Sequence, residues 1–127
     1  MSKGETFSRD TAHRVNAPWG SLTWLVNAEL VSGAEQTIGV VTIQPGHSND
    51  AHRHPNCEEV IYVMSGQCDQ RVGDSIRPLT AGEGVVIPRG VPHSSINTGD
   101  EVLNVLVSYS SPNRVVEPIG VPADVHT

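Results

Sequence analysis

The stretch from Pro45 to Gly66, PGHSNDAHRHPNCEEVIYVMSG, gathers side chains that bind metal ions. His52 and His54 are two residues apart, and on a β-strand such side chains point to the same face. A PNCE turn follows, and Glu59 then begins a run of β-forming residues, where its carboxylate can lie beside the two imidazoles. His93, in the segment GEGVVIPRGVPHSSIN, offers a third imidazole. Three imidazoles and one carboxylate form a donor set for a divalent transition metal.

Short β-strands must position these side chains. Apolar and polar residues alternate in many segments, which predicts strands at residues 21–27, 37–43, 59–64, 67–72, 75–79, 84–88, 93–97 and 101–109. Nearly every connection carries Gly, Pro, Asn or Asp, which are turn-forming residues. Strands this short and evenly spaced predict an all-β sandwich or closed barrel. We expect no helix longer than a couple of turns, which excludes a helix-turn-helix regulator.

The length and charge of the chain restrict its function further. A chain of 127 residues fits one domain, which we divide into an N-terminal arm (1–20), a barrel (21–109) and a C-terminal tail (110–127) that drapes over the barrel or frays. The net charge of -6 lacks the basic footprint of a nucleic-acid-binding protein. No segment approaches the roughly 18 apolar residues of a membrane span, and no signal-like segment is evident. We therefore expect a cytoplasmic protein without a nucleic-acid or membrane partner.

The same residues resemble the two motifs of the cupin superfamily. The first motif is Gly, five residues, His-x-His, three or four residues, Glu, six residues and Gly, and it matches Gly46, His52, His54, Glu59 and Gly66. The second is Gly, five residues, Pro-x-Gly, two residues, His, three residues and Asn, and it matches Gly82, Pro88, Gly90, His93 and Asn97. The spacer, residues 67–81, is similar to that of small single-domain cupins of the cupin 2 type. The resemblance implies a jelly-roll-like double-stranded β-helix barrel, a metal held by His52, His54, Glu59 and His93, and a homodimer with strands or arms exchanged near the N-terminus.

Several neighbouring residues compete for a role at the site. Glu58 also falls within the permitted gap after His54, but only Glu59 places the next motif glycine at the required distance, and Glu59 shares its strand face with Ile61. Cys57 lies in the ligand loop and is interpreted as a packing residue, because the four ligands are complete without it. The remaining histidines are interpreted as surface residues, with a place at the barrel mouth as an alternative for the first: His13, His47 and His126.

The two cysteines, Cys57 and Cys68, test the strand pairing. If the SG dipeptide at 65–66 is a hairpin turn, Cys68 faces Val63 and Cys57 faces Asp74. The offset along the hairpin then separates the thiols by roughly 20 Å, far beyond the ~7 Å Cα separation that a disulfide spans. We therefore expect two reduced thiols.

The donor set limits the metal and the chemistry. Three neutral imidazoles and one carboxylate leave a divalent ion with a net charge of about +1, which suits manganese, iron, cobalt, nickel or zinc. Four protein ligands would close a tetrahedral zinc ion, whereas a six-coordinate ion keeps two positions open. We favour manganese or iron, with nickel, cobalt or zinc as alternatives. Such an ion can polarise a carbonyl or enediol, activate water or bind dioxygen.

We therefore expect a metal-dependent enzyme that acts on a small oxygenated metabolite by oxygenation, isomerisation, decarboxylation or lyase chemistry. Glu59 could also act as a base, as the resemblance implies for its matching position in some cupins. The alternatives are a non-catalytic module that binds a sugar or sugar acid, which the aromatic content of only 4% disfavours, and a polyketide-pathway cyclase. Possible substrate-orienting residues are Gln44, Asn104 and Ser108. Two further pairs are interpreted as packing or dimer contacts (Trp19 and Trp24) and as solvated surface residues (Arg53 and Arg89).

Overall fold

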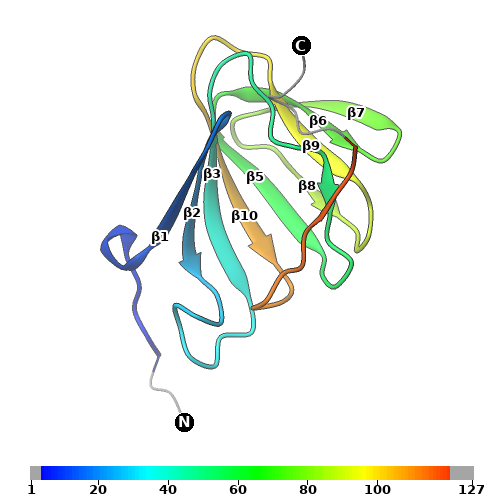
Figure 1. Cartoon of the computed structure of the whole chain (residues 1–127). Helices are drawn as coiled ribbons and strands as arrows, with labels where there is room; N and C mark the ends of the chain where they lie inside the picture. Colours follow the sequence, from blue (N-terminus) through cyan, green and yellow to red (C-terminus); the bar gives the residue numbers. More distant parts are fainter. Residues whose placement is uncertain (1–3, 121–127) are drawn as a thin grey trace.

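Two antiparallel β-sheets make up the computed structural model, which describes residues 4–120 (Figure 1). A short 3₁₀ turn, η1 (Arg9–Thr11), precedes the strands β1 (His13–Ala17), β2 (Gly20–Val26), β3 (Thr37–Ile43), β4 (His52–Arg53), β5 (Glu59–Ser65), β6 (Gln67–Val72), β7 (Ser75–Thr80), β8 (Gly84–Ile87), β9 (His93–Asn97), β10 (Leu103–Tyr109) and β11 (Glu117–Pro118). One sheet has the order β1-β2-β3-β10-β5-β8, and the other has the order β11-β4-β9-β6-β7. The predicted all-β fold is confirmed. Within residues 4–120, no helix has the length and hydropathy needed to cross a membrane.

Alternation along the central strands builds the core between the two sheets. In β3 and β10, every second side chain is buried, and β5 follows the same rule over its first five residues. The buried set includes Ile43, Ile61, Val63, Ile87, Leu103, Val105 and Val107. Each such side chain stabilises the fold by about 1.5–3 kcal/mol when it is fully removed from water. The period-two pattern of the sequence therefore reflects one face that packs inward and one that faces outward.

Gly39, in the middle of β3, leaves room for a large aromatic side chain. It lies opposite Trp24 of β2, and a Cβ atom at residue 39 would come within 2.5 Å of the indole ring. Trp24 is 5% exposed and its ring centroid lies 6.0 Å from that of Tyr109. Trp24 is thus a packing residue, which is one of the two roles predicted for it beside a dimer contact.

The predicted hairpin between residues 59–64 and 67–72 does not form. β5 pairs with β10 and β8, whereas β6 pairs with β7 and β9 in the other sheet. Gly66, whose φ of +88° favours glycine, is where the chain passes from one sheet to the other. Cys68 consequently faces Leu79 and Asn97 rather than Val63. Both cysteines are nevertheless buried and free, as expected.

The ends of the described chain are more regular than the sequence suggested. β1 forms inside the predicted arm and covers β2, so residues 21–27 are not an exposed sheet edge. β11 forms inside the predicted tail and pairs with β4, which confirms that this part of the tail drapes over the barrel. His126 lies outside the described residues.

Asn97, the last residue of the second motif, has a structural position. Its side-chain amide is 2% exposed and donates hydrogen bonds to the carbonyls of Ile43 and Glu101, both at 2.9 Å. Its Oδ1 accepts a hydrogen bond from the Gly99 N–H. The amide therefore ties the end of β9 to the end of β3, in the opposite sheet.

Candidate metal centre

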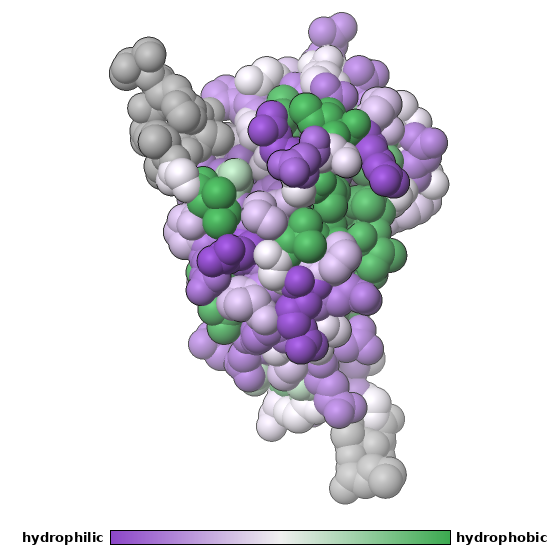
Figure 2. All heavy atoms as spheres, turned by 90° about the vertical axis from the view of Figure 1, so that its right-hand side faces the viewer, coloured by the Kyte–Doolittle hydropathy of each residue, from purple (hydrophilic) through white to green (hydrophobic). Residues whose placement is uncertain are grey.

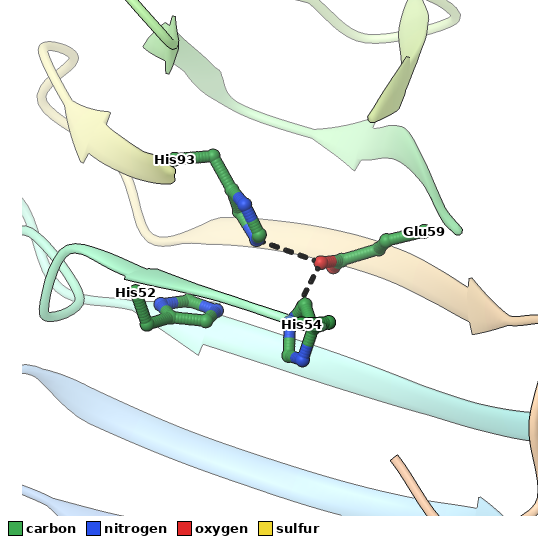
Figure 3. A group of neighbouring side chains, drawn as sticks. All are labelled: His52, His54, Glu59 and His93. Atoms are coloured by element: carbon green, nitrogen blue, oxygen red, sulfur yellow. Dashed lines mark ion pairs between the residues drawn. The ribbon is translucent and has the colours of Figure 1, made fainter. Parts of the chain in front are cut away.

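The four predicted ligands come from both sheets and converge. His52 opens β4 and His93 opens β9, and these two residues are directly paired across the strands. His54 follows β4, and Glu59 opens β5 in the other sheet. Figure 3 shows their side chains pointing toward one another, and one ligand atom from each residue lies within 4.8 Å of the others. The structure thus brings together the four residues that the sequence proposed as ligands.

Local backbone contacts fix the two motifs against each other. The Gly90 N–H donates a hydrogen bond to the carbonyl of His54 at 2.8 Å, and Gly90 has a φ of +79°, which favours glycine. Between the imidazoles, Arg53 points outward and forms an ion pair with Glu117 at 2.7 Å. This orientation confirms the predicted alternation, in which His52 and His54 share the inner face.

Each imidazole is oriented by a backbone carbonyl. Nδ1 of His52 lies 2.6 Å from the Asp50 carbonyl, Nδ1 of His54 lies 2.9 Å from the Val115 carbonyl, and Nδ1 of His93 lies 2.9 Å from the Val91 carbonyl. A carbonyl oxygen only accepts hydrogen bonds, so each Nδ1 must carry the proton and donate it. In the neutral ring, Nε2 is then a bare lone pair. This arrangement is typical of histidines that bind metal ions.

The atoms that face one another require a cation between them. Oε1 of Glu59 lies 2.8 Å from Nε2 of His93 and 3.2 Å from Nε2 of His54 (Figure 3). All three atoms are buried without a hydrogen-bond partner, and each buried unsatisfied group costs about 1–3 kcal/mol. Adjacent ligand atoms that lie about 2.1 Å from one ion at right angles are about 3 Å apart. A divalent metal ion therefore fits this donor set.

The protonation equilibria of the same group favour ligation. Burial, followed by the charge of His93, lowers the pKa of His52 to about 4, which keeps this imidazole neutral at physiological pH. Burial raises the pKa of Glu59, but the neighbouring imidazoles of His54 and His93 outweigh burial and lower the pKa to about 2. Burial lowers the pKa of His93, and the Glu59 carboxylate reverses this effect, so that the net shift is upward. In the metal-free protein, a proton on His93 can therefore stand in for part of the metal charge.

A cavity of about 200 Å³ lies between the sheets, with the four ligands in its lining. Its apolar wall is formed by Trp19, Leu22, Val41, Ile61, Val105, Val107 and Val116. Apart from the four ligands, its polar lining residues include Asn49, Asp50, Ser95, Tyr109 and Arg114. The cavity therefore offers metal-binding donors beside a mostly apolar space, the usual composition of a small-molecule site.

The three residues predicted to orient a substrate do not line this cavity. Gln44 is exposed after β3. Asn104 lies on the outer face of β10, where its side chain bonds with Thr42 and Ser65, and Ser108 shares that face. The inner face of β10 belongs to Val105, Val107 and Tyr109 because the sheet packs its apolar side into the core.

The competing residues are placed as follows. Glu59 is 3% exposed, whereas Glu58 faces solvent. Cys57 is buried in the core and is not part of the ligand group, as expected. His47 is half-buried outside that group, and exposed residues include His13 and Arg89. Trp19 packs in the core and also lines the cavity.

Two residues at the cavity escaped the sequence-based prediction. Tyr109 was given no role at the site, although its side chain lines the cavity. Burial, followed by the Glu59 carboxylate, raises the pKa of Tyr109 well above its usual value, and the Arg114 guanidinium acts in the opposite direction. Arg114 lies in the predicted tail, where no motif marks it. Only the return of the chain over the barrel places it at the cavity.

A sequence model of the cupin domain matches residues 39–109, which is more than half of the chain. The chain belongs to the cupin family. Its relatives include SchB of Streptomyces halstedii, with 33% identity over 64% of this cupin and 59% of that protein. The polyketide synthase CurC of Streptomyces cyaneus has 32% identity over 72% of this cupin and 59% of that protein. The chain thus spans little more than half the length of these curated relatives.

Solved structures support the same family. An oxalate decarboxylase from Lactobacillus farciminis, in a formate complex, matches with a TM-score of 0.80 and 25% identity over 87% of this cupin and 34% of that chain. An oxalate oxidase matches with a TM-score of 0.75 and 29% identity over 86% of this cupin and 60% of that chain. The predicted cupin barrel is therefore confirmed.

Proposed function

We propose that this cupin is an enzyme that uses a divalent metal ion to act on a small oxygenated metabolite. The observation that carries the proposal is the convergence of buried, unpartnered donor atoms from His54, Glu59 and His93 at a mostly apolar cavity. A bound ion would supply Lewis acidity toward an oxygen of the substrate or toward water. The reaction type is an oxygenation, isomerisation, decarboxylation or lyase reaction, and similarity to an oxalate decarboxylase and an oxalate oxidase supports decarboxylation or oxidation.

The side chains of the cavity would divide the work. His52, His54, Glu59 and His93 would hold the ion, with their donor atoms oriented in advance by backbone carbonyls. The apolar wall would exclude water and so strengthen the electrostatic interactions inside. The low pKa of Glu59 makes the carboxylate a better ligand than base. We therefore propose metal binding as the main role of Glu59 and proton acceptance as its second role.

Manganese or iron is the proposed metal. Four protein ligands complete the coordination of zinc, whereas an ion that takes six ligands would keep positions for substrate. Nickel, cobalt and zinc can bind the same donors, and the later metals bind more tightly in general. The metal that an overproduced sample contains can therefore differ from the native one.

The cavity limits the substrate. A volume of about 200 Å³ is smaller than the roughly 300–1,000 Å³ of sites for drug-sized ligands. A small metabolite fits this volume better than a molecule of several rings. The apolar wall offers few partners for sugar hydroxyls, so a module that only binds a sugar or sugar acid is the weaker alternative.

A polyketide-pathway cyclase is the second candidate. The similarity to CurC, a polyketide synthase by name, over 72% of this chain favours it. The cavity volume favours a small substrate instead. Turnover of aromatic polyketide intermediates, without turnover of small enols or acids, would decide for the cyclase.

We also propose that this cupin forms a homodimer through the outer face of the six-stranded sheet. Val60 faces Val86 across β5 and β8, and Tyr62 faces Leu106 across β5 and β10. These side chains are 36–55% exposed, which leaves a contiguous apolar surface of the kind that marks association sites. Figure 2 shows hydrophobic residues gathered on the side of the molecule that carries β7 and β8 in Figure 1. Light scattering should give a dimer mass that Tyr62→Glu reduces to that of a monomer. A monomeric wild type would refute the dimer.

The enzyme proposal is tested by elemental analysis of protein from its native host together with oxygen uptake and product analysis on small enols, diketones and acids. Near-stoichiometric manganese or iron with turnover of any compound supports the proposal. Metal without turnover would favour a binding module, and protein without metal would refute a metal-dependent enzyme. The proposed cytoplasmic location is tested by cell fractionation.

A further inference from the structure

Arg114 is held rigidly at the cavity by contacts on both sides of it in the chain. The preceding residue, Asn113, accepts a hydrogen bond at its carbonyl from the Asn56 side chain, at 2.9 Å. The N–H of the following residue, Val115, donates to the Asn56 Oδ1 at 2.9 Å, and the Val115 carbonyl accepts from His54 Nδ1. One amide side chain and one predicted metal ligand therefore fix the backbone that carries Arg114. Its position at the cavity is built into the fold.

The guanidinium of Arg114 rests on aromatic rings and has no anionic partner among residues 4–120. Its Cζ lies 4.0 Å from the centroid of the Trp24 ring and 5.6 Å from that of Tyr109. Its Nε is buried without a hydrogen-bond partner, and none of the ion pairs within residues 4–120 involves Arg114. Stacking on aromatic rings stabilises an arginine, but it satisfies no N–H donor. A half-buried cation that lines a cavity without a counter-ion is suited to bind an anion.

The arginine and the metal-binding group belong to the same cavity. Tyr109 lies between them, because its ring centroid is 4.9 Å from that of His54 and 5.6 Å from the Arg114 Cζ. We propose that Arg114 binds the carboxylate of the substrate, so that the substrate is a small oxo- or hydroxy-carboxylic acid with a short apolar body. One part of this assignment rests on the proposed function. The oxo or hydroxyl oxygen of the acid would face the metal-binding group of His52, His54, Glu59 and His93.

The shape of the donors selects a carboxylate. The two Nη groups of a guanidinium lie in one plane and form a fork that matches the two oxygens of a carboxylate. Lysine has the same charge without this fork, so the two residues are not equivalent at such a site. The apolar wall accommodates the hydrocarbon part of a monoacid.

The test measures binding of 2-oxobutanoate, 3-hydroxybutanoate and phenylpyruvate, each beside its uncharged methyl ester, to the full chain by calorimetry. Because a carboxylate can bind a metal ion directly, every titration is made with metal-loaded and with metal-stripped protein. We expect at least one acid to bind wild type more tightly than its ester in both forms. Arg114→Gln should weaken acid binding about tenfold or more and leave ester binding unchanged. Arg114→Lys should retain part of the preference for the acid.

Arg77→Gln, which changes an exposed arginine on β7, is the matched control and should change neither affinity. Equal losses for acid and ester in Arg114→Gln would show that Arg114 only packs against Trp24, and the proposal would be wrong. No preference of wild type for any acid would also overturn it. A preference that persists in stripped protein, when no metal is retained after reloading, would support the arginine site while refuting the metal-dependent enzyme.

Discussion

At one side of the cavity, His52, His54, Glu59 and His93 meet through motif residues that lie close together in sequence or on paired strands. At the other, Arg114 reaches the cavity from the segment after β10 and rests on Trp24 of β2, ninety residues earlier in the chain. The histidine side is oriented by backbone carbonyls, and the arginine side is oriented by aromatic packing. The first arrangement fixes donor atoms toward one point, whereas the second leaves a planar cation open toward the cavity.

The two sides of the cavity differ in how far they depend on particular side chains. His52 and His93 are oriented by carbonyls two residues away in sequence, whereas His54 is oriented by the Val115 carbonyl, which the Asn56 side chain helps to hold. The position of Arg114 depends on the side chains of Asn56, Trp24 and Tyr109. The metal-binding side would therefore be general to the fold, and the arginine side would select the substrate of this chain.

The largest effect is expected from a substitution on the histidine side of the cavity, and the quantity it changes is the metal affinity. His93→Ala removes one donor and leaves the buried Glu59 carboxylate with one fewer partner, so metal affinity should fall more than about 100-fold. Metal analysis after dialysis should change from near one equivalent to near zero, while circular dichroism retains the β-sheet signal. His47→Ala, outside the group, should keep its metal. Full retention in His93→Ala would show that the ligands are assigned incorrectly.

Removal of the metal should reveal how much stability the histidine side contributes. An ion present at 1,000 times its Kd stabilises the folded state by about 4 kcal/mol. For a domain of this size, chelation should then lower the Tm by about 10 °C or more. Calorimetry with and without chelator measures the shift, and His93→Ala should show almost none. An identical Tm for wild type in both conditions would mean that the group binds no ion tightly.

Asn97 belongs to the second motif but has a structural role, unlike the motif residues that face the cavity. Asn97→Ala leaves the Ile43 carbonyl buried without its donor, so the free energy of unfolding should fall by about 2–3 kcal/mol. At low temperature the folded variant should still bind one equivalent of metal. Urea unfolding and metal analysis on the same sample measure both quantities. A loss of metal in a fully folded variant would show that Asn97 takes part in metal binding.

Much of the fold followed from local pattern, because a strand between two apolar layers must alternate. The segment 37–43 is a strand at its predicted bounds. Strand partners did not follow, since a two-residue connection such as Ser65-Gly66 has the same local sequence whether it folds a hairpin or crosses between sheets. β4 has only two residues and β11 exists only through its pairing with β4. Such strands carry no periodicity to detect.

The candidate site divides in the same way. The four donors were found because their types and spacing follow a motif. Gln44 and Asn104 were chosen because they are polar. The inner face of β10 is apolar, so a polar residue on this strand, such as Asn104, lies on the outer face and not in the cavity. Arg114 could not be found from its neighbours in sequence, because its role depends on Trp24 and on the path of the tail.

The two thiols offer a smaller contrast between the metal-binding loop and the sheet. Burial raises the pKa of both cysteines, that of Cys68 to about 11, with a further contribution from the charge of Glu59 at Cys57 and of Asp69 at Cys68. Both are therefore thiols at pH 7.5, and burial should make them slow toward an alkylating reagent. Stability that depends on the neutral thiol of Cys68 is present below pH 9 and is lost as the pH rises toward about 11.

Chelation should expose the two thiols by different routes. Cys57 lies between the ligands His54 and Glu59, so loss of the metal should allow its loop to open locally and raise its alkylation rate about tenfold. Cys68 is held in β6 between β7 and β9, and its rate should follow global unfolding instead. Mass spectrometry of the alkylated peptides separates the two sites. Equal acceleration at both would mean that Cys57, like Cys68, is exposed only by unfolding of the whole barrel and not by local opening of its loop.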